Sequence, residues 1–492
     1  MSGLFVIYLN IEIYAERMAC KMKLEEKKLQ RREQMATEPL SRIIPKMAIP
    51  TIVAFLINSI YSLADTYFVS SLGTNATAAV SVNASLDLLI MMMGSMLAVG
   101  ANSYIARLLG ENNNKKASQV LSTSFLLALG AGLLLTVLGT VFMEPMVMLL
   151  GATETCKDFS IDYATYVLLA APFMTTSFVM NQCLRSEGSA TLSMIGMGFG
   201  GILNCILDPI FILKAGDPLF GNILMPFGLG MGVAGASVAT AISKVVSFVI
   251  LFFPYVTRRS LLHLSIRNFF PSKDILKEIV TVGSSSMFRS GLGVLAGILL
   301  NDMAGNISDS VLAGIGVTTK IMMFPFSIIL GFGAGFQPVA GFNWGAKKYD
   351  RVLESYRFSS IVAVVGSIIM AGILAVFADS IIVVFAGTDP LMREIGRLSI
   401  VLQCIALPVH AWVAVVNMLC AGLGNAKGAF LLATSRQGTC FLPLLIPAAF
   451  LGQYAIASVQ AAADVVSLAL GIPIAISMLK HIKTTQQEAL ND

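Results

Sequence analysis

The chain has 492 residues, of which 56% are hydrophobic and only 12% are charged, and its mean hydropathy is +0.79. A soluble globular protein carries about 25% charged residues, so this composition excludes the soluble classes and predicts an all-α protein that crosses a membrane many times. The net charge of +5 is spread between apolar runs, which argues against a nucleic-acid partner. The seven cysteines and three histidines show no spacing typical of a metal or redox site.

The first 42 residues form a segment ahead of the first predicted span. Residues 1–14 are apolar but too short to cross a bilayer, and a basic stretch follows from Arg17 to Arg32. A cleaved signal peptide has its charges before its apolar part, so this order argues against one. Two interpretations stay open, namely a cytoplasmic or interfacial helix, or an over-long start with Met35 as the natural first residue; we prefer the second.

Twelve apolar segments are each long enough to cross a bilayer at roughly 20 residues per crossing. Lys and Arg are concentrated in alternate connections, which predicts that both termini lie in the cytoplasm. A basic linker over 257–274 separates two predicted six-helix lobes, at 43–256 and 275–480, and 481–492 form a cytoplasmic tail. The segments are predicted to begin near Ile43, Ala78, Ser118, Ile161, Leu192, Gly232, Ile275, Val311, Ser355, Ile395, Gly428 and Ala455.

The two halves of the chain repeat one another. The run from Gly100 to Gly110 resembles the run from Gly335 to Gly345, at an offset of 335 − 100 = 235 residues, and both runs are followed by a pair of lysines. Each half has an even number of helices, so the repeats are parallel and related by an axis along the membrane normal. This arrangement is typical of transporters that have their substrate site between or within the two halves.

A carboxylate interrupts the fifth apolar segment. Asp208 precedes Pro209 and follows Asn204 by four residues, so Asn204 and Asp208 share one helix face. Pro209 cannot donate a hydrogen bond to the carbonyl of Cys205, which is therefore left free. An Asp near the bilayer centre costs about 2.5–3.5 kcal/mol and usually serves an ion or proton pathway, although a neighbouring helix can also satisfy it.

Other polar residues of the first half support a site of this kind. Asn58, Tyr61 and Asp65 fall on one face of the first helix, the fourth helix holds Asn181, and the sixth holds Thr240. Singly, such residues more often make ordinary helix–helix hydrogen bonds. Together with two carboxylates they favour a proton or ion site in the first lobe. The second helix also holds Asp87, and the repeat partner of Asp65 is Leu300, so the fold itself does not require this polar set.

The second half has fewer buried charges. Arg289 lies in the seventh helix and Asp464 in the twelfth, and the two could pair, either as a structural salt bridge or in gating. Met180 and Met287 are candidates for a substrate cavity because methionine is flexible and polarizable, although methionine in membrane helices more often fills gaps or faces lipid.

Four runs together resemble the multidrug and toxic compound extrusion (MATE) family, over about residues 40–483. The resemblance implies a twelve-helix, two-lobed exporter with a V-shaped cavity between the lobes, from the bacterial branch that has its acidic site in the N-terminal lobe. It also implies a cation-coupling site at Asp65, Asn181, Asn204, Asp208 and Thr240. Other branches carry a coupling acid in the seventh helix, whereas the comparable stretch here, residues 284–290, has none. The four runs are Pro50–Gly73, Asn181–Gly188, Asn204–Ile212 and Gly232–Thr240.

The sequence therefore predicts a secondary active multidrug efflux transporter that exports amphipathic, often cationic, compounds in exchange for protons or sodium ions. It is expected to need no cofactor, to catalyse no reaction, and to work as a monomer in the bacterial inner membrane. In the expected mechanism, neutralisation of Asp65 and Asp208 lets helices repack near Pro209 and displaces the drug. The main alternative is a flippase for a lipid-linked precursor, which would need basic residues for phosphate. A membrane-embedded aspartyl protease is disfavoured because no Gly-x-Gly-Asp run lies in a span.

Overall fold

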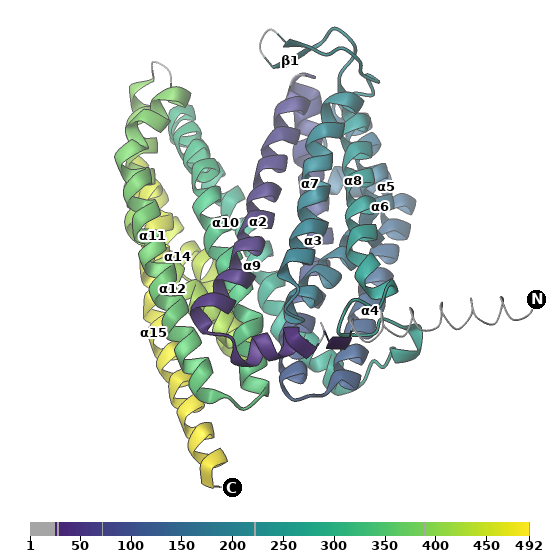
Figure 1. The fold of residues 1–492 in the computed structure, drawn as a ribbon. Helices are drawn as coiled ribbons and strands as arrows, with labels where there is room; N and C mark the ends of the chain where they lie inside the picture. The colour runs from purple at the N-terminus through teal and green to yellow at the C-terminus, as the bar shows by residue number, and fades with distance from the viewer. Residues whose placement is uncertain (1–24, 27–28, 71, 221–222, 387–388, 492) are drawn as a thin grey trace, which may run out of the picture.

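The computed structural model describes residues 25–26, 29–70, 72–220, 223–386 and 389–491, and in this part the chain is almost entirely helical (Figure 1). The apolar stretch predicted at 1–14 lies outside the described residues. The first lobe contains α2 (Leu40–Ser70), α3 (Thr74–Gly110), α4 (Asn114–Val141), α5 (Met143–Leu149), α6 (Lys157–Ser186), α7 (Ala190–Ile212), β1 (Pro218–Phe220), β2 (Ile223–Leu224) and α8 (Val233–Val256). The linker and second lobe contain η1 (Ile266–Asn268), α9 (Lys273–Gly305), α10 (Asp309–Gly345), α11 (Tyr349–Ala386), α12 (Pro390–Leu423), α13 (Ala426–Thr434), η2 (Ser435–Thr439), α14 (Phe441–Leu451) and α15 (Gln453–Asn491).

The twelve predicted spans are confirmed: the described residues include twelve helices that are long and apolar enough to cross a bilayer. The eleventh span is divided into α13, the π-helical turn η2 and α14. Between α7 and α8 the strands β1 and β2 pair in antiparallel fashion, which the hydropathy pattern did not indicate. The ninth helix begins at Tyr349 and not near Ser355, because its polar first turns continue beyond the apolar segment.

Short polar side chains fix where several helices begin. The side chain of Asn113 accepts a hydrogen bond from the backbone of Lys116 at the start of α4, and Ser272 does the same for Ile275 in α9. Asp389 accepts from two backbone N–H groups at the start of α12. These caps satisfy donors that have no partner inside the helix, and each is typically worth about 1 kcal/mol.

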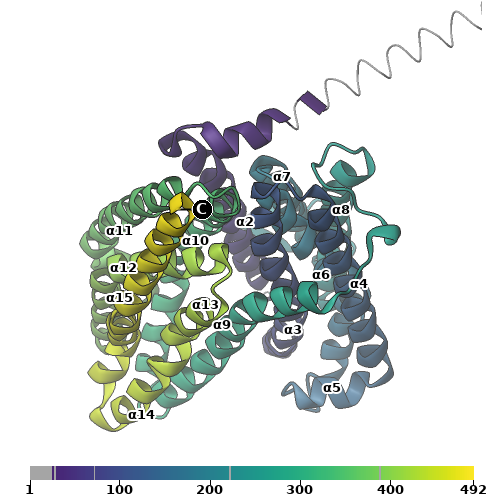
Figure 2. The ribbon, with the colours of Figure 1, turned by 90° about the horizontal axis from the view of Figure 1, so that it is seen from below.

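The helices form two lobes that pack together near the end where the chain termini lie and diverge at the opposite end (Figure 1). Viewed from the side of the termini, α2 and α3 lie among the first-lobe helices and α9 extends toward them from the second lobe (Figure 2). Contacts between the lobes join α2 with α10 and α3 with both α9 and α10. The shape is that of a V whose apex is built by the first two helices of each lobe.

The repeated glycine runs lie in this apex. A β-carbon on Gly100 of α3 would collide with the backbone of Ile279 in α9, and one on Gly335 of α10 would collide with the backbone of Ala48 in α2. Only glycine allows the helix backbones to approach this closely. The repeat found in the sequence therefore marks equivalent contact positions of the two lobes.

Polar contacts also join the lobes at the apex. The hydroxyls of Ser59 and Ser327 are 2.9 Å apart, Ser103 donates to the carbonyl of Ala421, and Arg107 forms an ion pair with Glu278 at 2.6 Å. The segment that precedes α2 also bonds to the second lobe, since Asn343, Lys348 and Arg351 donate to the carbonyls of Met35, Ala36 and Glu38, respectively.

The linker between the lobes is attached along α4. The backbone N–H of His263 donates to Ser118 Oγ at 3.1 Å, and that of Ser265 donates to Ser122 Oγ at 3.2 Å. These bonds satisfy linker backbone groups that have no secondary-structure partner. The linker is thus held against the first lobe up to the start of α9.

Candidate functional site

The centre of the candidate site is the side-chain triplet of Asp208, Asn204 and Thr240, where α7 meets α8. Asp208 is completely buried, and Asn204 Nδ2 donates to Asp208 Oδ1 at 2.9 Å and to Thr240 Oγ1 at 3.2 Å. The shared helix face of Asn204 and Asp208 that the sequence predicted is confirmed. Because the amide nitrogen of Asn204 donates both of these hydrogen bonds, the amide oxygen of Asn204 has no partner within the triplet.

Several oxygens around this triplet are buried and make no hydrogen bond with the described residues. They are Oδ1 of Asn204, Oδ2 of Asp208, Oδ1 of Asp65 and Oδ1 of Asp87. The charge of Asp65 interacts with those of Asp208 and Asp87. The helices α2, α3 and α7 therefore each contribute one carboxylate to the same site. Buried oxygens without donors are the chemical environment that a proton or a hard cation such as sodium satisfies.

A lysine also belongs to this site, although the sequence analysis did not single it out. Lys244 Nζ donates to the hydroxyl of Tyr61 at 3.0 Å and lies 4.7 Å from the centroid of its ring. Its charge also interacts with Asp65 and Asp87. The available signal was a lysine inside the sixth apolar segment, one helical turn after Thr240. We call Tyr61, Asp65, Asp87, Asn204, Asp208, Thr240 and Lys244 the N-lobe acidic cluster.

The N-lobe acidic cluster occupies the half of the lobe that is farther from the chain termini. Asp208 lies four residues before the end of α7 and Asp65 lies five before the end of α2, while Thr240 lies seven residues after the start of α8. All three helix ends are on the side of the β1–β2 hairpin (Figure 1). The cluster is therefore nearer the open end of the V than its apex.

Three predicted site residues lie elsewhere. Asn181 accepts a hydrogen bond from Arg185 at 2.6 Å and donates to the carbonyl of Ser193, near the other end of α6. Asn58 is exposed, and the side chain of Met180 is completely buried in the core. Pro209 lies within α7 directly after Asp208, and Met287 is half-buried on α9.

The predicted ion pair between Arg289 and Asp464 is wrong. Asp464 is bound by Arg436, whose Nε lies 2.8 Å from Asp464 Oδ1, and Arg289 instead donates to Ser286 Oγ at 3.2 Å. Arg436 lies on the π-helical turn η2, inside the eleventh span. Its position in an apolar segment was the signal that the sequence analysis overlooked.

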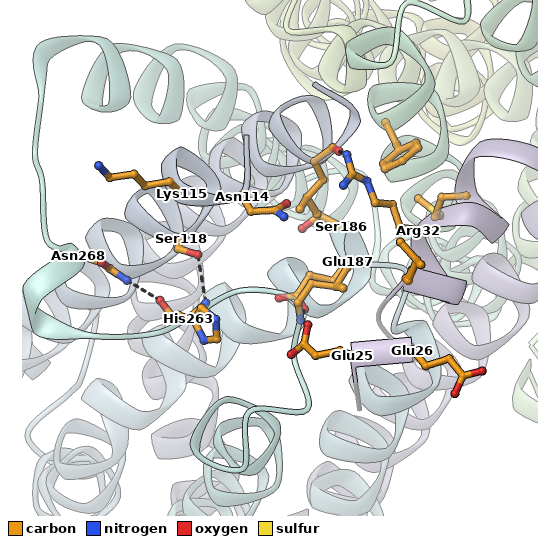
Figure 3. A pocket seen from close by; sticks show the side chains of 15 residues that line it. Glu25, Glu26, Arg32, Asn114, Lys115, Ser118, Ser186, Glu187, His263 and Asn268 are labelled. Atoms are coloured by element: carbon orange, nitrogen blue, oxygen red, sulfur yellow. Dashed lines mark hydrogen bonds between the residues drawn. The ribbon is translucent and has the colours of Figure 1, made fainter. Parts of the chain in front are cut away.

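A cavity of about 740 Å³ lies between the segment that precedes α2, the end of α6, the start of α4 and the linker between the lobes (Figure 3). Its lining combines acidic and basic side chains, including Glu187, Arg32 and Lys115. One wall is the helical segment 29–37, in which Arg31 donates to Ser189 and Arg32 donates to the carbonyl of Leu109. The same segment accepts hydrogen bonds from the second lobe, since Lys348 donates to the carbonyl of Ala36.

Glu187 follows α6 and is buried beside this cavity. Its Oε2 accepts from Ser260 Oγ at 2.6 Å and from the backbone N–H of Leu261 at 2.7 Å. Burial raises the pKa of Glu187 from 4.5 to about 7, against the opposing effect of these hydrogen bonds. Because the folded protein holds this proton more tightly than the unfolded chain, the contribution of Glu187 to stability is complete below pH 4.5 and is lost as the pH rises through about 7.

Glu187→Gln is therefore expected to remove a pH dependence of stability worth up to about 3 kcal/mol. Glutamine keeps an acceptor oxygen for Ser260 and Leu261 and cannot ionise. The measurement is thermal inactivation of the purified protein between pH 5 and pH 8, with Glu111→Gln as the control because Glu111 is exposed. An unchanged slope in Glu187→Gln would show that Glu187 does not hold the proton.

Comparisons with known proteins agree on one family. The family model MatE matches residues 50–210 and 286–445. The multidrug export protein MepA of Staphylococcus aureus strain N315 is 26% identical over 410 residues, covering 83% of this chain and 87% of that protein. A crystal structure of MATE in complex with MaL6 has a TM-score of 0.84 at 24% identity, covering 92% of this chain and 99% of that one. An outward-facing multidrug resistance MATE family transporter of the MOP superfamily has a TM-score of 0.84 at 23% identity, covering 92% and 98%.

Proposed function

Because the chain belongs to the MatE family of membrane transporters, we propose that it exports amphipathic, often cationic, organic compounds in exchange for protons or sodium ions. It is a multi-pass membrane protein and a transporter, not an enzyme. The drug substrates are inferred from MepA, whose name describes multidrug export. The coupling to a cation is inferred from the geometry of the N-lobe acidic cluster.

The unbonded oxygen atoms of Asp65, Asn204 and Asp208 are the observation that supports cation coupling most strongly. An uncompensated carboxylate in an apolar lobe is costly, and bringing three carboxylates together adds repulsion between like charges. Lys244 supplies one positive charge against Asp65, Asp87 and Asp208, so the cluster still lacks balancing charge. Entry of a proton or a sodium ion removes part of this imbalance.

Exchange follows if the two charge states of the cluster favour different packings of the first lobe. Asp208 lies beside Pro209, and Pro209 leaves the carbonyl of Cys205 without its helical donor. Local rearrangement of α7 at this position breaks no hydrogen bond donated by the backbone of Pro209, which has no N–H group. Cation binding then biases the lobe toward the state that releases drug, provided that the cation binds the two states with different affinities.

The arrangement of the lobes supplies a route for the substrate. Glycine contacts hold the lobes together at the apex, while their other halves diverge (Figure 1). With both termini in the cytoplasm of a bacterial cell, the open end faces outward and the cluster lies near the exit. In this account a monomer is the functional unit, since both lobes belong to one chain.

The experiment that tests this function is dye efflux from proteoliposomes that contain the purified wild-type protein. Ethidium is loaded, and an inward proton gradient or an inward sodium gradient is imposed in turn. Efflux under one gradient, abolished by the matching ionophore, would support the proposal and name the ion. Absence of gradient-driven efflux for ethidium and other cationic dyes would contradict it and favour the lipid-linked flippase.

A further inference from the structure

Lys244 is the positively charged member of the N-lobe acidic cluster. Its Nζ donates to the hydroxyl of Tyr61 at 3.0 Å and lies 4.7 Å from the centroid of the Tyr61 ring. An ammonium group has three N–H donors, and among the described residues Tyr61 is the one hydrogen-bond acceptor of Lys244. Two of its donors are therefore left for a carboxylate within reach.

The contact between Lys244 and Tyr61 lies between two carboxylates along the helix axes. Asp65 and Tyr61 lie five and nine residues before the end of α2, and Asp87 lies thirteen residues after the start of α3. At 1.5 Å per residue, Asp65, Tyr61 and Asp87 are roughly 8, 14 and 20 Å from those helix ends, which adjoin in the sequence. The charge of Lys244 interacts with both carboxylates, so its ammonium has an outer and an inner partner.

One ammonium does not satisfy both of these carboxylates. Oδ1 of Asp65 and Oδ1 of Asp87 are buried and make no hydrogen bond with the described residues. A buried acceptor without a partner destabilises the structure, so each carboxylate favours any arrangement that brings a cation to it. The lysine side chain is flexible and ends in a compact charge, which can approach Asp65 or Asp87 from its contact with Tyr61.

The other titratable groups around Lys244 supply no second cation. In addition to Asp208, α7 contributes Cys205, whose thiol lies in the field of Asp208, and α6 contributes Tyr163, which interacts with the same acids. Among the described residues, Lys244 is the cation whose charge acts on the carboxylates of α2 and α3. A coupling cation that enters the cluster therefore competes with Lys244 for the same oxygen atoms.

We propose that Lys244 is a tethered competitor of the coupling cation, and that Asp87 accepts its ammonium when that cation binds. The inference rests on the proposed cation exchange and names the residues that set the cation affinity of the cluster. Before the cation enters, the ammonium is shared between Asp65 and Asp87. A proton or sodium ion that neutralises Asp65 leaves Asp87 as the remaining partner of Lys244. Lys244 and Asp87 are thus positioning residues, which act on the coupling cation through Asp65.

Competition of this kind suits an exporter that must release its coupling cation on the other side of the membrane. A very tight site would hold the cation in every state, whereas exchange needs different affinities in two states. The ammonium weakens cation binding because it already neutralises part of the negative charge. Asp87 strengthens cation binding because it draws the ammonium away from Asp65. Lys244 and Asp87 therefore act on the cation affinity in opposite directions, which a purely structural salt bridge would not do.

The test is the thermal unfolding of the purified full-length protein in detergent, which involves neither drug nor transport. A cation that binds the folded protein raises the unfolding temperature by mass action. Sodium is titrated at constant ionic strength, and the pH is titrated in sodium-free buffer. The variants are Lys244→Gln, Lys244→Arg, Asp87→Asn and the double variant Lys244→Gln/Asp87→Asn. Glutamine keeps a donor for Tyr61, and Lys320→Gln is the matched control because Lys320 is an exposed lysine of α10.

Lys244→Gln is expected to lower the cation concentration at half-saturation about tenfold or more, because the tethered competitor has been removed. Asp87→Asn is expected to raise that concentration by a similar factor, because the ammonium then binds Asp65 alone. Lys244→Arg keeps the charge and Lys320→Gln leaves the cluster intact, so both are expected to match the wild type. The double variant removes one charge of each sign and is expected to lie between the two single variants.

Shifts of Lys244→Gln and Asp87→Asn in the same direction, or equal midpoints in all variants, would overturn the inference. So would a wild-type unfolding temperature that responds to neither ion. The elution volume and the unfolding temperature without added cation show whether each variant is folded, and the comparison of the double variant with Asp87→Asn repeats the removal of Lys244 in a second background. Ethidium efflux by the wild type is measured independently, so failure of the competition leaves the export function standing, and absence of efflux does not alter the binding midpoints.

Discussion

Asp208→Asn is expected to reduce gradient-driven dye efflux to the level of protein-free liposomes. Asparagine keeps the size of the side chain and an oxygen acceptor for Asn204, which donates to Asp208 at 2.9 Å. It cannot take up a proton and has no charge to attract sodium. The loss therefore measures coupling and not the fold of α7.

Asp65→Asn should show the same loss, because the charge of Asp65 interacts with that of Asp208 in one site. Asp302→Asn makes the same chemical change at an exposed carboxylate of the second lobe and is expected to leave efflux intact. Expression, elution volume and ethidium binding of each variant are measured alongside. Full efflux by Asp208→Asn would move the coupling site out of the first lobe.

A disulfide between Ser59→Cys and Ser327→Cys is expected to stop transport completely. The two hydroxyls are 2.9 Å apart and join the first helix of the first lobe to the second helix of the second lobe, so cysteines placed there are close enough to bond. Alternating access requires the apex to open when the other end closes, and a covalent link prevents this movement.

The double variant is made in a background whose native cysteines are replaced by serine. Efflux is measured after oxidation and again after reduction, which should restore it. Each single-cysteine variant, oxidised in the same way, is the control and should transport normally. Undiminished efflux by fully cross-linked protein would show that the apex does not open during transport.

The sequence predicted the twelve-helix architecture well because the hydropathy of the membrane spans determines it. Spans must be apolar and satisfy their own backbone hydrogen bonds, so hydropathy alone revealed all twelve. The exact starts were less predictable, since Tyr349 begins a helix whose first turns are polar. The glycine repeat at Gly100 and Gly335 was visible in the sequence, but its reason, close contact of the lobe backbones, needed the structure.

The candidate site was only partly predictable. Asn204 and Asp208 share a helix face, so their spacing was sufficient to place them together. Lys244 and Asp87 come from other helices, and no spacing rule connects helices that are distant in the sequence. The same limit explains why Asp464 was paired with Arg289 and not with Arg436.

The most direct test of cation exchange at the N-lobe acidic cluster is the cation flux that a drug gradient drives. Proteoliposomes holding a pH-sensitive or sodium-sensitive dye receive an outward gradient of ethidium with no imposed ion gradient. The wild type is expected to drive protons or sodium ions inward as ethidium leaves, and Asp208→Asn is expected to drive neither. Ethidium exit from the wild type without any cation flux, or equal flux in Asp208→Asn, would contradict exchange at this cluster.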